Sequence, residues 1–465
     1  MDHICQNKKQ NCYNCAFKIK KCPKKRHKKH AKRSENDSKR SKKDPQTFRK
    51  RSEIVRNGPK FFENGDGVTE PRGFFASGVH CDVKGKKDGA LDLGVIYSKK
   101  PCTGAGVFTT NDVKAAPVTY CIDLLKNPKS TFHAVVANSG NANACTGAQG
   151  DADTKKMASE VARHLKVHSK EILVFSTGRI GVPLPMSRIT AGIRDATDDV
   201  LQEFDGAHAF QEAILTSDTC TKSCSAKIET PGGEITVGGV VKGAGMIEPN
   251  MATMLSFLAT DALLERDLSD QILFETCEKT FNRITVDGDT STNDACVLVS
   301  TGLSGVDCNK SPQLELMKQG IFQVMRDLAM AIVKDGEGAT KFVEVRVKGG
   351  ESKDDSRNIA YSIANSPLVK TALFASDPNW GRLVMAVGKA NAAIDTSKID
   401  IQINDLLLMK MGQIEKNYTE EKGSVEMKKP SILITVDLNL GQYEDVVWTT
   451  DLSHDYVKIN SEYRT

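Results

Sequence analysis

Residues 242–262, KGAGMIEPNMATMLSFLATDA, combine a glycine-rich turn with a threonine hydroxyl at the start of an apolar run. Gly243 and Gly245 permit backbone angles that other residues avoid, and a proline stiffens the approach to the apolar run. Met254–Ala259 is largely apolar, which predicts a strand covered on both faces. Thr253 is then either a core threonine whose hydroxyl has its hydrogen-bond partners or a nucleophile held by a rigid backbone.

A threonine hydroxyl is a weak nucleophile and needs a base. Histidine is the usual candidate, but no histidine after residue 65 falls in a motif that looks catalytic, so a Ser/His/Asp arrangement has no support. These histidines are His80, His133, His164, His168, His208 and His454. The alternative base is the nucleophile's own α-amine, which exists only if the peptide bond before Thr253 is broken. An α-amine titrates at about 7.7–8.0, which suits a general base.

Further motifs accompany this stretch in order along the chain. They are GVHCDVK (78–84), TGAGVFTTNDVKAAPV (103–118), NSGNANACTG (138–147), STGRIGVPLP (176–185), TSDT (216–219), FNRITVDGDTSTND (281–294), KDGEGATK (334–341), DPNWGR (377–382) and YVKINSEYRT (456–465). Together with the PNMATML stretch, they resemble the bifunctional glutamate N-acetyltransferase / ornithine acetyltransferase family of arginine biosynthesis. The resemblance covers about residues 66–465.

The resemblance implies a role for each matched site residue. Ala252–Thr253 matches the family's self-cleavage bond, and Thr253 matches its nucleophile. Cleavage would free the Thr253 amine and give chains of 252 and 213 residues. Thr177 and Gly178 match the pair that stabilises the oxyanion, where a glycine N–H and a threonine hydroxyl are suitable donors. The substrate-binding positions are Thr219, Lys242, Thr253, Glu337, Asn460 and Thr465.

The resemblance also implies a reaction. N-acetylornithine would acetylate Thr253 and leave as ornithine, and glutamate would then accept the acetyl group in a ping-pong sequence. Lys242 suits the substrate carboxylate, and Glu337 suits the ornithine amine. Acetyl-CoA as a second donor is left open, and no GxGxxG or Walker motif suggests a cofactor. The family precedent further implies a heterotetramer of two α and two β chains. A self-processing threonine aminopeptidase or amidohydrolase, with water as acceptor, is the alternative.

The composition is that of an ordinary globular protein, apart from an unusual N-terminal segment. The sequence has no run of 18 apolar residues and no apolar signal segment, so we expect no membrane anchor. The 13 cysteines are scattered, which suggests reduced thiols, and we therefore expect a cytoplasmic protein. Residues 1–60 carry a net charge of +16, whereas the rest of the chain carries −11. The sequence therefore predicts an acidic catalytic body behind a basic extension.

The basic extension, residues 1–65, has too few large apolar residues to form a core and is expected to be mostly disordered. Cys5, Cys12, Cys15 and Cys22 form C-x6-C-x2-C-x6-C, a density of thiolates that could hold a zinc ion, although only one pair has the tight spacing. Its charge also permits nonspecific attraction to nucleic acid, but few aromatic residues are available for base stacking.

The body alternates predicted strands and helices, which indicates an α/β or mixed α+β fold in layers. Apolar residues at helical spacing predict three helices, one through Met157, Val161 and Leu165, one from Leu268 to Phe281 and one from Leu314 to Ile332. Short apolar runs predict strands at Ala134–Asn138, Ile172–Ser176, Ile359–Ala364, Ile399–Ile403 and Ile432–Leu438. With self-cleavage, the domains would be residues 1–65, 66–252 (α chain) and 253–465 (β chain).

One acidic segment, DGDTSTND (287–294), resembles a metal-binding loop only superficially. It lacks the glycine and the distal glutamate of an EF-hand, so we interpret it as a structural turn and predict no metal site in the body.

Overall fold

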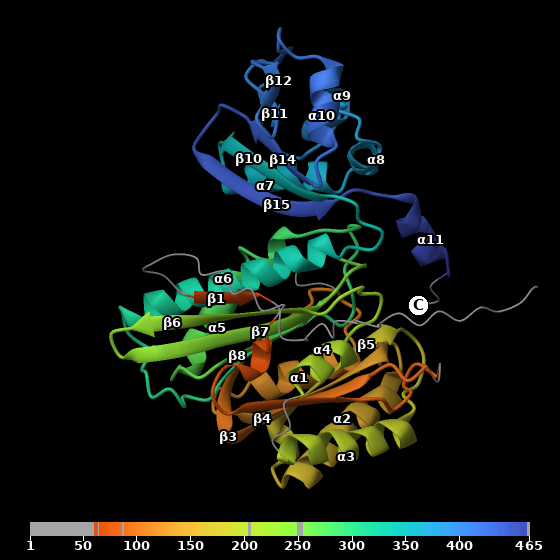
Figure 1. Ribbon diagram of the computed structural model, residues 1–465, viewed down its shortest axis with the longest axis vertical. Helices are drawn as coiled ribbons and strands as arrows, with labels where there is room; N and C mark the ends of the chain where they lie inside the picture. Colours follow the sequence, from red (N-terminus) through yellow and green to blue (C-terminus); the bar gives the residue numbers. More distant parts are fainter. Residues whose placement is uncertain (1–59, 64, 86–87, 203–205, 249–253, 463–465) are drawn as a thin grey trace, which may run out of the picture. The chain divides into compact units, whose positions relative to one another are not determined.

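A computed structural model describes residues 60–63, 65–85, 88–202, 206–248 and 254–462, all within the unit that spans residues 51–465. Thr253, Ala252, Thr465 and the four cysteines of the extension therefore lie outside the described residues. Two mixed sheets with flanking helices form the fold, which confirms the predicted α/β class (Figure 1). None of the described helices is long and apolar enough to cross a membrane.

The first sheet has nine strands, in the order β1-β6-β7-β8-β9-β3-β4-β5, with β2 paired to β3. Its strands are β1 (Lys60–Glu63), β2 (Phe74–Val79), β3 (Leu93–Phe108), β4 (Thr131–Asn141), β5 (Ile172–Arg179), β6 (Lys222–Thr230), β7 (Gly233–Lys242), β8 (Leu255–Thr260) and β9 (Ala295–Ser300). The accompanying helices are η2 (Gly67–Thr69), α1 (Ala116–Leu125), α2 (Gly147–Leu165), η3 (Ser169–Glu171), α3 (Met186–Leu201), α4 (Ala207–Ala213), α5 (Arg266–Cys277), η4 (Phe281–Arg283) and α6 (Gln313–Lys334).

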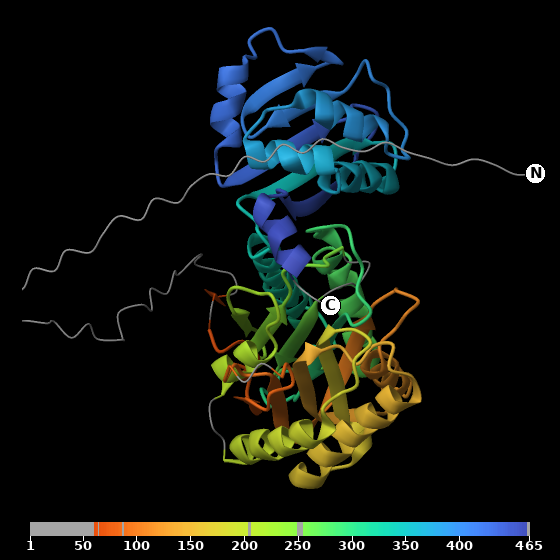
Figure 2. The same cartoon turned by 90° about the vertical axis from the view of Figure 1, so that its right-hand side faces the viewer.

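The first sheet folds back on itself, so that its two halves share one apolar core. Phe175 on β5 and Phe257 on β8 meet edge to face, with ring centroids 5.2 Å apart, although their strands lie far apart in the sheet order. Helices α2 and α3 pack on the outer face of β3, β4 and β5, and α5 and α6 pack on the outer face of β6 to β9 (Figures 1 and 2). Strands in the middle of this arrangement are buried on both faces, which explains why the sequence of β8 is largely apolar.

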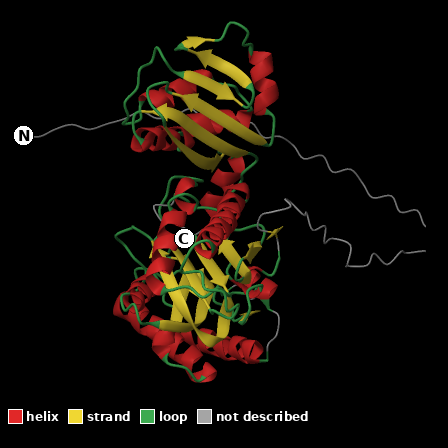
Figure 3. Cartoon of the chain, turned by 90° about the vertical axis from the view of Figure 1, so that its left-hand side faces the viewer, coloured by secondary structure: helices red, strands yellow, loops and turns green. Residues whose placement is uncertain are grey.

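The second sheet has six strands, in the order β13-β12-β11-β14-β10-β15 (Figure 3). Its strands are β10 (Phe342–Gly350), β11 (Asp400–Ile403), β12 (Leu406–Lys410), β13 (Gln413–Ile414), β14 (Ser431–Asp437) and β15 (Tyr443–Thr450). The helices of this part of the chain are α7 (Lys353–Ala364), α8 (Pro367–Ala375), α9 (Trp380–Gly388), α10 (Glu420–Met427) and the C-terminal α11 (His454–Glu462). Residues of α7 to α10 share a core with the sheet.

Most of the predicted elements are confirmed, and one is wrong. The predicted helices correspond to α2, α5 and α6, with Phe281 falling in η4 just beyond α5. The predicted strands correspond to β4, β5, β8, β11 and β14. Ile359–Ala364 was predicted as a strand but belongs to α7. Ser352 caps that helix by accepting a hydrogen bond from the Asp355 N–H, and its buried residues recur at helical spacing.

Candidate functional site

Lys242, the last residue of β7, is almost fully buried, with 4% of its surface exposed. Its Nζ donates to Thr216 Oγ1 at 2.9 Å and to Thr177 Oγ1 at 3.4 Å. Burial lowers the pKa of Lys242 below its ordinary value, and the nearby Asp218 carboxylate opposes that shift. This lysine is therefore not a solvated surface residue, because its ammonium group faces two hydroxyls inside the fold.

A buried ion cluster holds this part of the sheet in place. Asp218 accepts hydrogen bonds from Lys222 Nζ at 2.8 Å and from the Gly243 N–H at 2.6 Å, and Lys222 also pairs with Asp335 at 2.5 Å. Burial alone would raise the pKa of Asp218, but Lys242 and Lys222 hold it well below its usual range. The cluster fixes the backbone at Gly243, directly after Lys242, and thereby orients the lysine.

Thr177 and Gly178 lie at the end of β5, where this strand pairs in parallel with Ser139 and Gly140 of β4. Gly178 has a φ of 129°, and a Cβ at this position would overlap the backbone of Gly140 and Asn141. Only glycine therefore fits between the two strands here. The Thr177 hydroxyl accepts from Lys242, so the predicted oxyanion pair and the predicted carboxylate ligand meet in one place.

Glu337 reaches the same place from the loop after α6. Its backbone N–H donates to the Ala244 carbonyl at 2.8 Å, and its carboxylate accepts a 2.8 Å hydrogen bond from the Asn460 side chain on α11. A Cβ at Gly245 would overlap the Glu337 carboxylate. Gly245 is thus needed for space, whereas the positive φ angles of this turn are at Gly243, with 156°, and at Met246, with 56°.

The segment before β9, interpreted from the sequence as a structural turn, supplies polar groups to this part of the fold. Asn293 is buried and donates from Nδ2 to the carbonyls of Ala142 and Ser176, at 2.6 and 2.8 Å. Asp287 accepts from the backbone N–H groups of Met246 and Ile247 at 2.7 and 2.8 Å. The DGDTSTND segment therefore braces the strand end of β5 and the glycine-rich turn.

These groups line one small pocket. Five of the predicted site residues take part, namely Thr177, Gly178, Lys242, Glu337 and Asn460. The other lining residues are Ala142, Ile180, Thr216, Ser217, Gly245, Met246, Ser291, Thr292 and Asn293. Thr216 and Asn293 were not predicted as site residues, and their only sequence signal is their position within the TSDT (216–219) and FNRITVDGDTSTND (281–294) motifs.

Thr219 does not line this pocket. Its N–H and hydroxyl donate to the Asp335 carboxylate, and it borders a neighbouring cavity together with Cys220 and Lys222. Asp335, which binds Thr219, also pairs with Lys222, and Lys222 pairs with Asp218. Asp218 accepts from the N–H of Gly243, the residue that follows Lys242, so Thr219 is linked to the pocket through this ion cluster. Among the described cysteines, Cys145 and Cys220 are exposed and Cys296 is buried.

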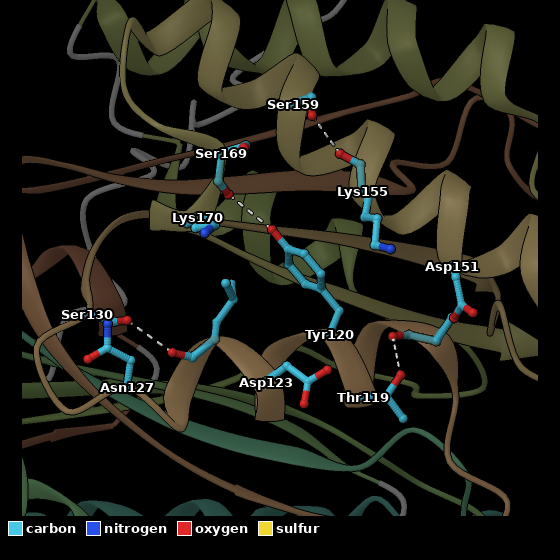
Figure 4. A pocket seen from close by; sticks show the side chains of 12 residues that line it. Thr119, Tyr120, Asp123, Asn127, Ser130, Asp151, Lys155, Ser159, Ser169 and Lys170 are labelled. Carbon is cyan, nitrogen blue, oxygen red and sulfur yellow. Dashed lines mark hydrogen bonds between the residues drawn. The ribbon is translucent and has the colours of Figure 1, made fainter.

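A larger cavity, of about 670 Å³, lies elsewhere, between α1, α2 and η3 (Figure 4). Its charged lining residues, Asp123, Asp151, Lys155 and Lys170, are all exposed, and Tyr120 closes one side by donating to the Ser169 carbonyl. We place the candidate site in the smaller pocket because buried, mutually oriented polar groups converge there. Within the described ranges, no group of three or more His, Cys, Asp or Glu side chains is arranged to hold a metal ion.

Comparison with known proteins identifies the relatives of this chain. The model of the ArgJ family matches residues 75–465. The chain belongs to the ArgJ family. The ArgJ match begins after the basic extension, so that residues 1–74 lie outside it.

Curated ArgJ proteins resemble the chain over nearly their whole length. The arginine biosynthesis bifunctional protein ArgJ of Pseudomonas fluorescens is 44% identical over 384 residues, which cover 82% of this chain and 94% of that protein. The ArgJ protein of Symbiobacterium thermophilum is 44% identical over 401 residues, covering 86% and 98%. The solved ornithine acetyltransferase of Mycobacterium tuberculosis, in complex with ornithine, is 36% identical, covering 41% of this chain and 98% of that chain, with a TM-score of 0.37.

The chain is therefore an acetyltransferase of arginine biosynthesis, as the ArgJ relatives are. The alternative of an aminopeptidase or amidohydrolase is not favoured. The ArgJ assignment confirms the predicted family and class of activity, whereas the roles of the individual site residues stay predictions.

Proposed function

We propose that this enzyme transfers an acetyl group from N-acetylornithine to glutamate through an acetyl ester on Thr253. The observation that carries the proposal is the convergence of Thr177, Gly178, Lys242, Glu337 and Asn460 on one pocket beside the start of β8. Lys242 is paired with Leu255 in the β7–β8 ladder, and Leu255 follows Thr253 by two residues in the chain. The described start of β8 is therefore paired with a residue that lines this pocket.

The reaction begins with self-cleavage. The Thr253 hydroxyl attacks the Ala252 carbonyl, the peptide bond becomes an ester, and hydrolysis of the ester releases the Ala252 carboxylate. The new α-amine of Thr253 then acts as the base that the weakly nucleophilic hydroxyl requires. The absence of histidine from the lining of the described pocket supports this choice of base.

Acetyl transfer follows in two half-reactions. In the first, the Thr253 oxygen bonds to the acetyl carbon, the carbon–nitrogen bond breaks, and ornithine leaves with the proton taken from the hydroxyl. In the second, the glutamate amine attacks the acetyl ester and restores the hydroxyl. The oxyanion of each tetrahedral intermediate would be bound by the Gly178 N–H and the Thr177 hydroxyl, donors of the kind that this charge requires.

The pocket also suggests how the amino acids are bound. The Lys242 ammonium group would pair with the substrate carboxylate, while Glu337, oriented by Asn460, would accept the ornithine side-chain amine. Thr219 and Thr465 complete the proposed binding set. The same proposal includes acetyl-CoA as a second donor and the absence of a bound cofactor. It also includes assembly into a heterotetramer of two α and two β chains and a cytoplasmic location. Membership of the ArgJ family supports these proposals.

The test is the intact mass of the denatured protein, purified with and without prior incubation with N-acetylornithine. We expect chains of 252 and 213 residues, with one acetyl group added to the shorter chain after incubation. Thr253→Ala should stay uncut, whereas Thr371→Ala, which alters an exposed threonine on α8, should be cut like the wild type. A folded but uncut wild-type chain, or a cut Thr253→Ala chain, would refute the proposal.

A further inference from the structure

Asn293, shortly before β9, has a buried side-chain amide that the proposed mechanism does not use. It lines the candidate pocket with only 6% of its surface exposed. Its Nδ2 donates to the Ala142 carbonyl at 2.6 Å and to the Ser176 carbonyl at 2.8 Å, and its Oδ1 accepts from the Thr292 hydroxyl at 2.6 Å. An amide nitrogen carries two N–H groups, and both are used here, so the side chain is held in one orientation.

The two carbonyls that Asn293 binds belong to different strands of the first sheet. Ala142 directly follows β4, Ser176 lies in β5, and the two strands are paired in parallel. The register of this ladder shifts next to Gly140, and Gly140 and Gly178 have φ angles of 93° and 129°. Because glycine permits many backbone conformations, strand pairing alone constrains this end of the ladder weakly. The Asn293 side chain joins the two strands where that constraint is weakest.

The hydrogen bond to Ser176 acts on the residue that precedes the Thr177–Gly178 pair. The Ser176 carbonyl and the Thr177 N–H belong to one planar peptide unit, so fixing the carbonyl fixes the direction in which the chain enters Thr177. The Ser176 hydroxyl donates to Asn138 Oδ1 at 2.7 Å, and Asn138 Nδ2 donates to the Asn141 carbonyl at 2.9 Å. Ser176 is therefore held both through its backbone and through its side chain.

Asn293 is itself anchored by the segment between β3 and α1. The buried Thr109 donates from its hydroxyl to the Ser291 carbonyl at 2.7 Å, and the buried Ala115 donates from its N–H to the Thr292 carbonyl at 2.9 Å. Both residues belong to a sequence motif that had no assigned function. Buried polar networks whose members all have partners are rigid, so this support holds the amide in place.

We infer that Asn293 is a positioning residue for acetyl transfer, which holds the two strand ends so that the Thr177 hydroxyl and the Gly178 N–H face the oxyanion. The inference rests on the proposed function, which gives these two donors their role. Such donors are effective only when they are oriented before the charge develops, and a displacement of about 1 Å can cost about a hundredfold in rate. Asn293 acts through the backbone, because both of its N–H groups are already bound to carbonyls.

The test uses Asn293→Asp, which keeps the size of the side chain but, as a carboxylate, has no N–H group to donate to the two carbonyls. We expect kcat, counted per cut chain from the intact mass, to fall about ten- to a hundredfold. The Kd of ornithine, measured by calorimetry, should stay within about twofold of the wild-type value, because the oxyanion exists only in the transition state and its intermediates.

Asn404→Asp is the matched control. Asn404 lies in the turn between β11 and β12, where its Nδ2 donates to Glu426 at 2.7 Å and its Oδ1 accepts from the Leu433 N–H at 2.9 Å. This variant should lower the free energy of unfolding in urea while kcat stays at the wild-type value. Wild-type kcat in Asn293→Asp, or an ornithine affinity reduced as much as its kcat, would overturn the inference. An equal loss of kcat in Asn404→Asp would do the same.

Thr292→Val covers the case in which Asn293→Asp does not fold or is not cut. Valine keeps the shape of the side chain but removes the hydroxyl that holds Asn293 Oδ1. Since both N–H donors of the amide remain, kcat should fall only about three- to tenfold, with unchanged ornithine affinity. Wild-type kcat in this variant would then overturn the inference. A wild type that is uncut, or not acetylated by N-acetylornithine, would instead refute the proposed function itself.

Discussion

The side-chain amide of Asn460 donates a 2.8 Å hydrogen bond to the Glu337 carboxylate, although 123 residues separate the two in the sequence. The contact brings the C-terminal helix α11 to the loop after α6. Tyr456, one turn earlier on α11, donates to Asp287 at 3.2 Å, and Asp287 in turn binds the backbone of Met246 and Ile247. The helix is thus held at two points on the wall of the pocket.

Deletion of Asn460–Thr465 should leave a folded enzyme that has lost most of its activity. No described side chain of α11 is buried, so its last turn contributes little to the core. The deletion removes the partner of Glu337, and loss of one hydrogen bond to a charged group corresponds to about 1.5–3 kcal/mol. We expect kcat/KM to fall at least about tenfold while the thermal melting temperature changes little. Retained full activity would contradict the role assigned to Asn460.

Gly245→Ala should weaken substrate binding, because the added methyl group would overlap the Glu337 carboxylate. The carboxylate must then move away from the position in which it would accept the ornithine amine. We expect KM for N-acetylornithine to rise by about tenfold or more, measured by steady-state kinetics. Gly388→Ala on α9 is the control, since a Cβ there meets no atom within 4 Å. Equal effects of the two variants would count against this role.

Lys242→Met should separate function from stability. The variant keeps an unbranched side chain in the buried site but removes the cation, so kcat/KM should fall by about ten- to a hundredfold. Lys222→Met, by contrast, leaves the buried carboxylates of Asp218 and Asp335 without their shared cation and should lower the free energy of unfolding by about 3 kcal/mol or more. Denaturant unfolding measures the stability of both variants, and steady-state kinetics measures their kcat/KM. A Lys242→Met enzyme with normal kcat/KM would refute the role of Lys242 in substrate binding.

Lys370 should make stability depend on pH in the alkaline range. Its Nζ donates to Thr449 Oγ1 at 2.9 Å, and burial lowers its pKa from 10.5 to about 8. Between these values the unfolded chain binds more protons than the folded chain, so the free energy of unfolding rises as pH increases from about 8 to about 10.5.

The Lys370→Met variant cannot titrate at this position and should lack this rise. The stability of the wild type relative to the variant should therefore increase by about 3 kcal/mol across the window. Urea unfolding of both proteins at several pH values measures the difference. Parallel stability–pH curves would show that Lys370 titrates normally.

Periodic patterns in the sequence predicted the longer elements well. The apolar spacing from Leu314 to Ile332 corresponds to α6, and the apolar run after Thr253 corresponds to β8. Ile359–Ala364 failed because six residues are too few to separate a buried strand from the buried side of a helix. The deciding signal, the Ser352 cap with its acidic first turn, lay just upstream.

The site was predicted through its resemblance to a family rather than from local patterns. Thr177, Gly178, Lys242, Glu337 and Asn460 line one pocket, whereas Thr219 borders a neighbouring one, and their roles stay predictions. The reason for a glycine at position 245 was not predictable from the residues alone. It depends on the space beside the Glu337 carboxylate, and that space does not exist along a linear chain.

The sequence by itself determined the family, the class of reaction and the layered α/β character, because these follow from residue types and their order. Only the tertiary structure decided which of these groups meet. The parallel pairing of β4 with β5 leaves no room for a Cβ at Gly178. Lys242 is buried, so that its ammonium group donates to two hydroxyls instead of contacting solvent. Such contacts join residues that are distant in sequence, and long-range packing rather than local propensity establishes them.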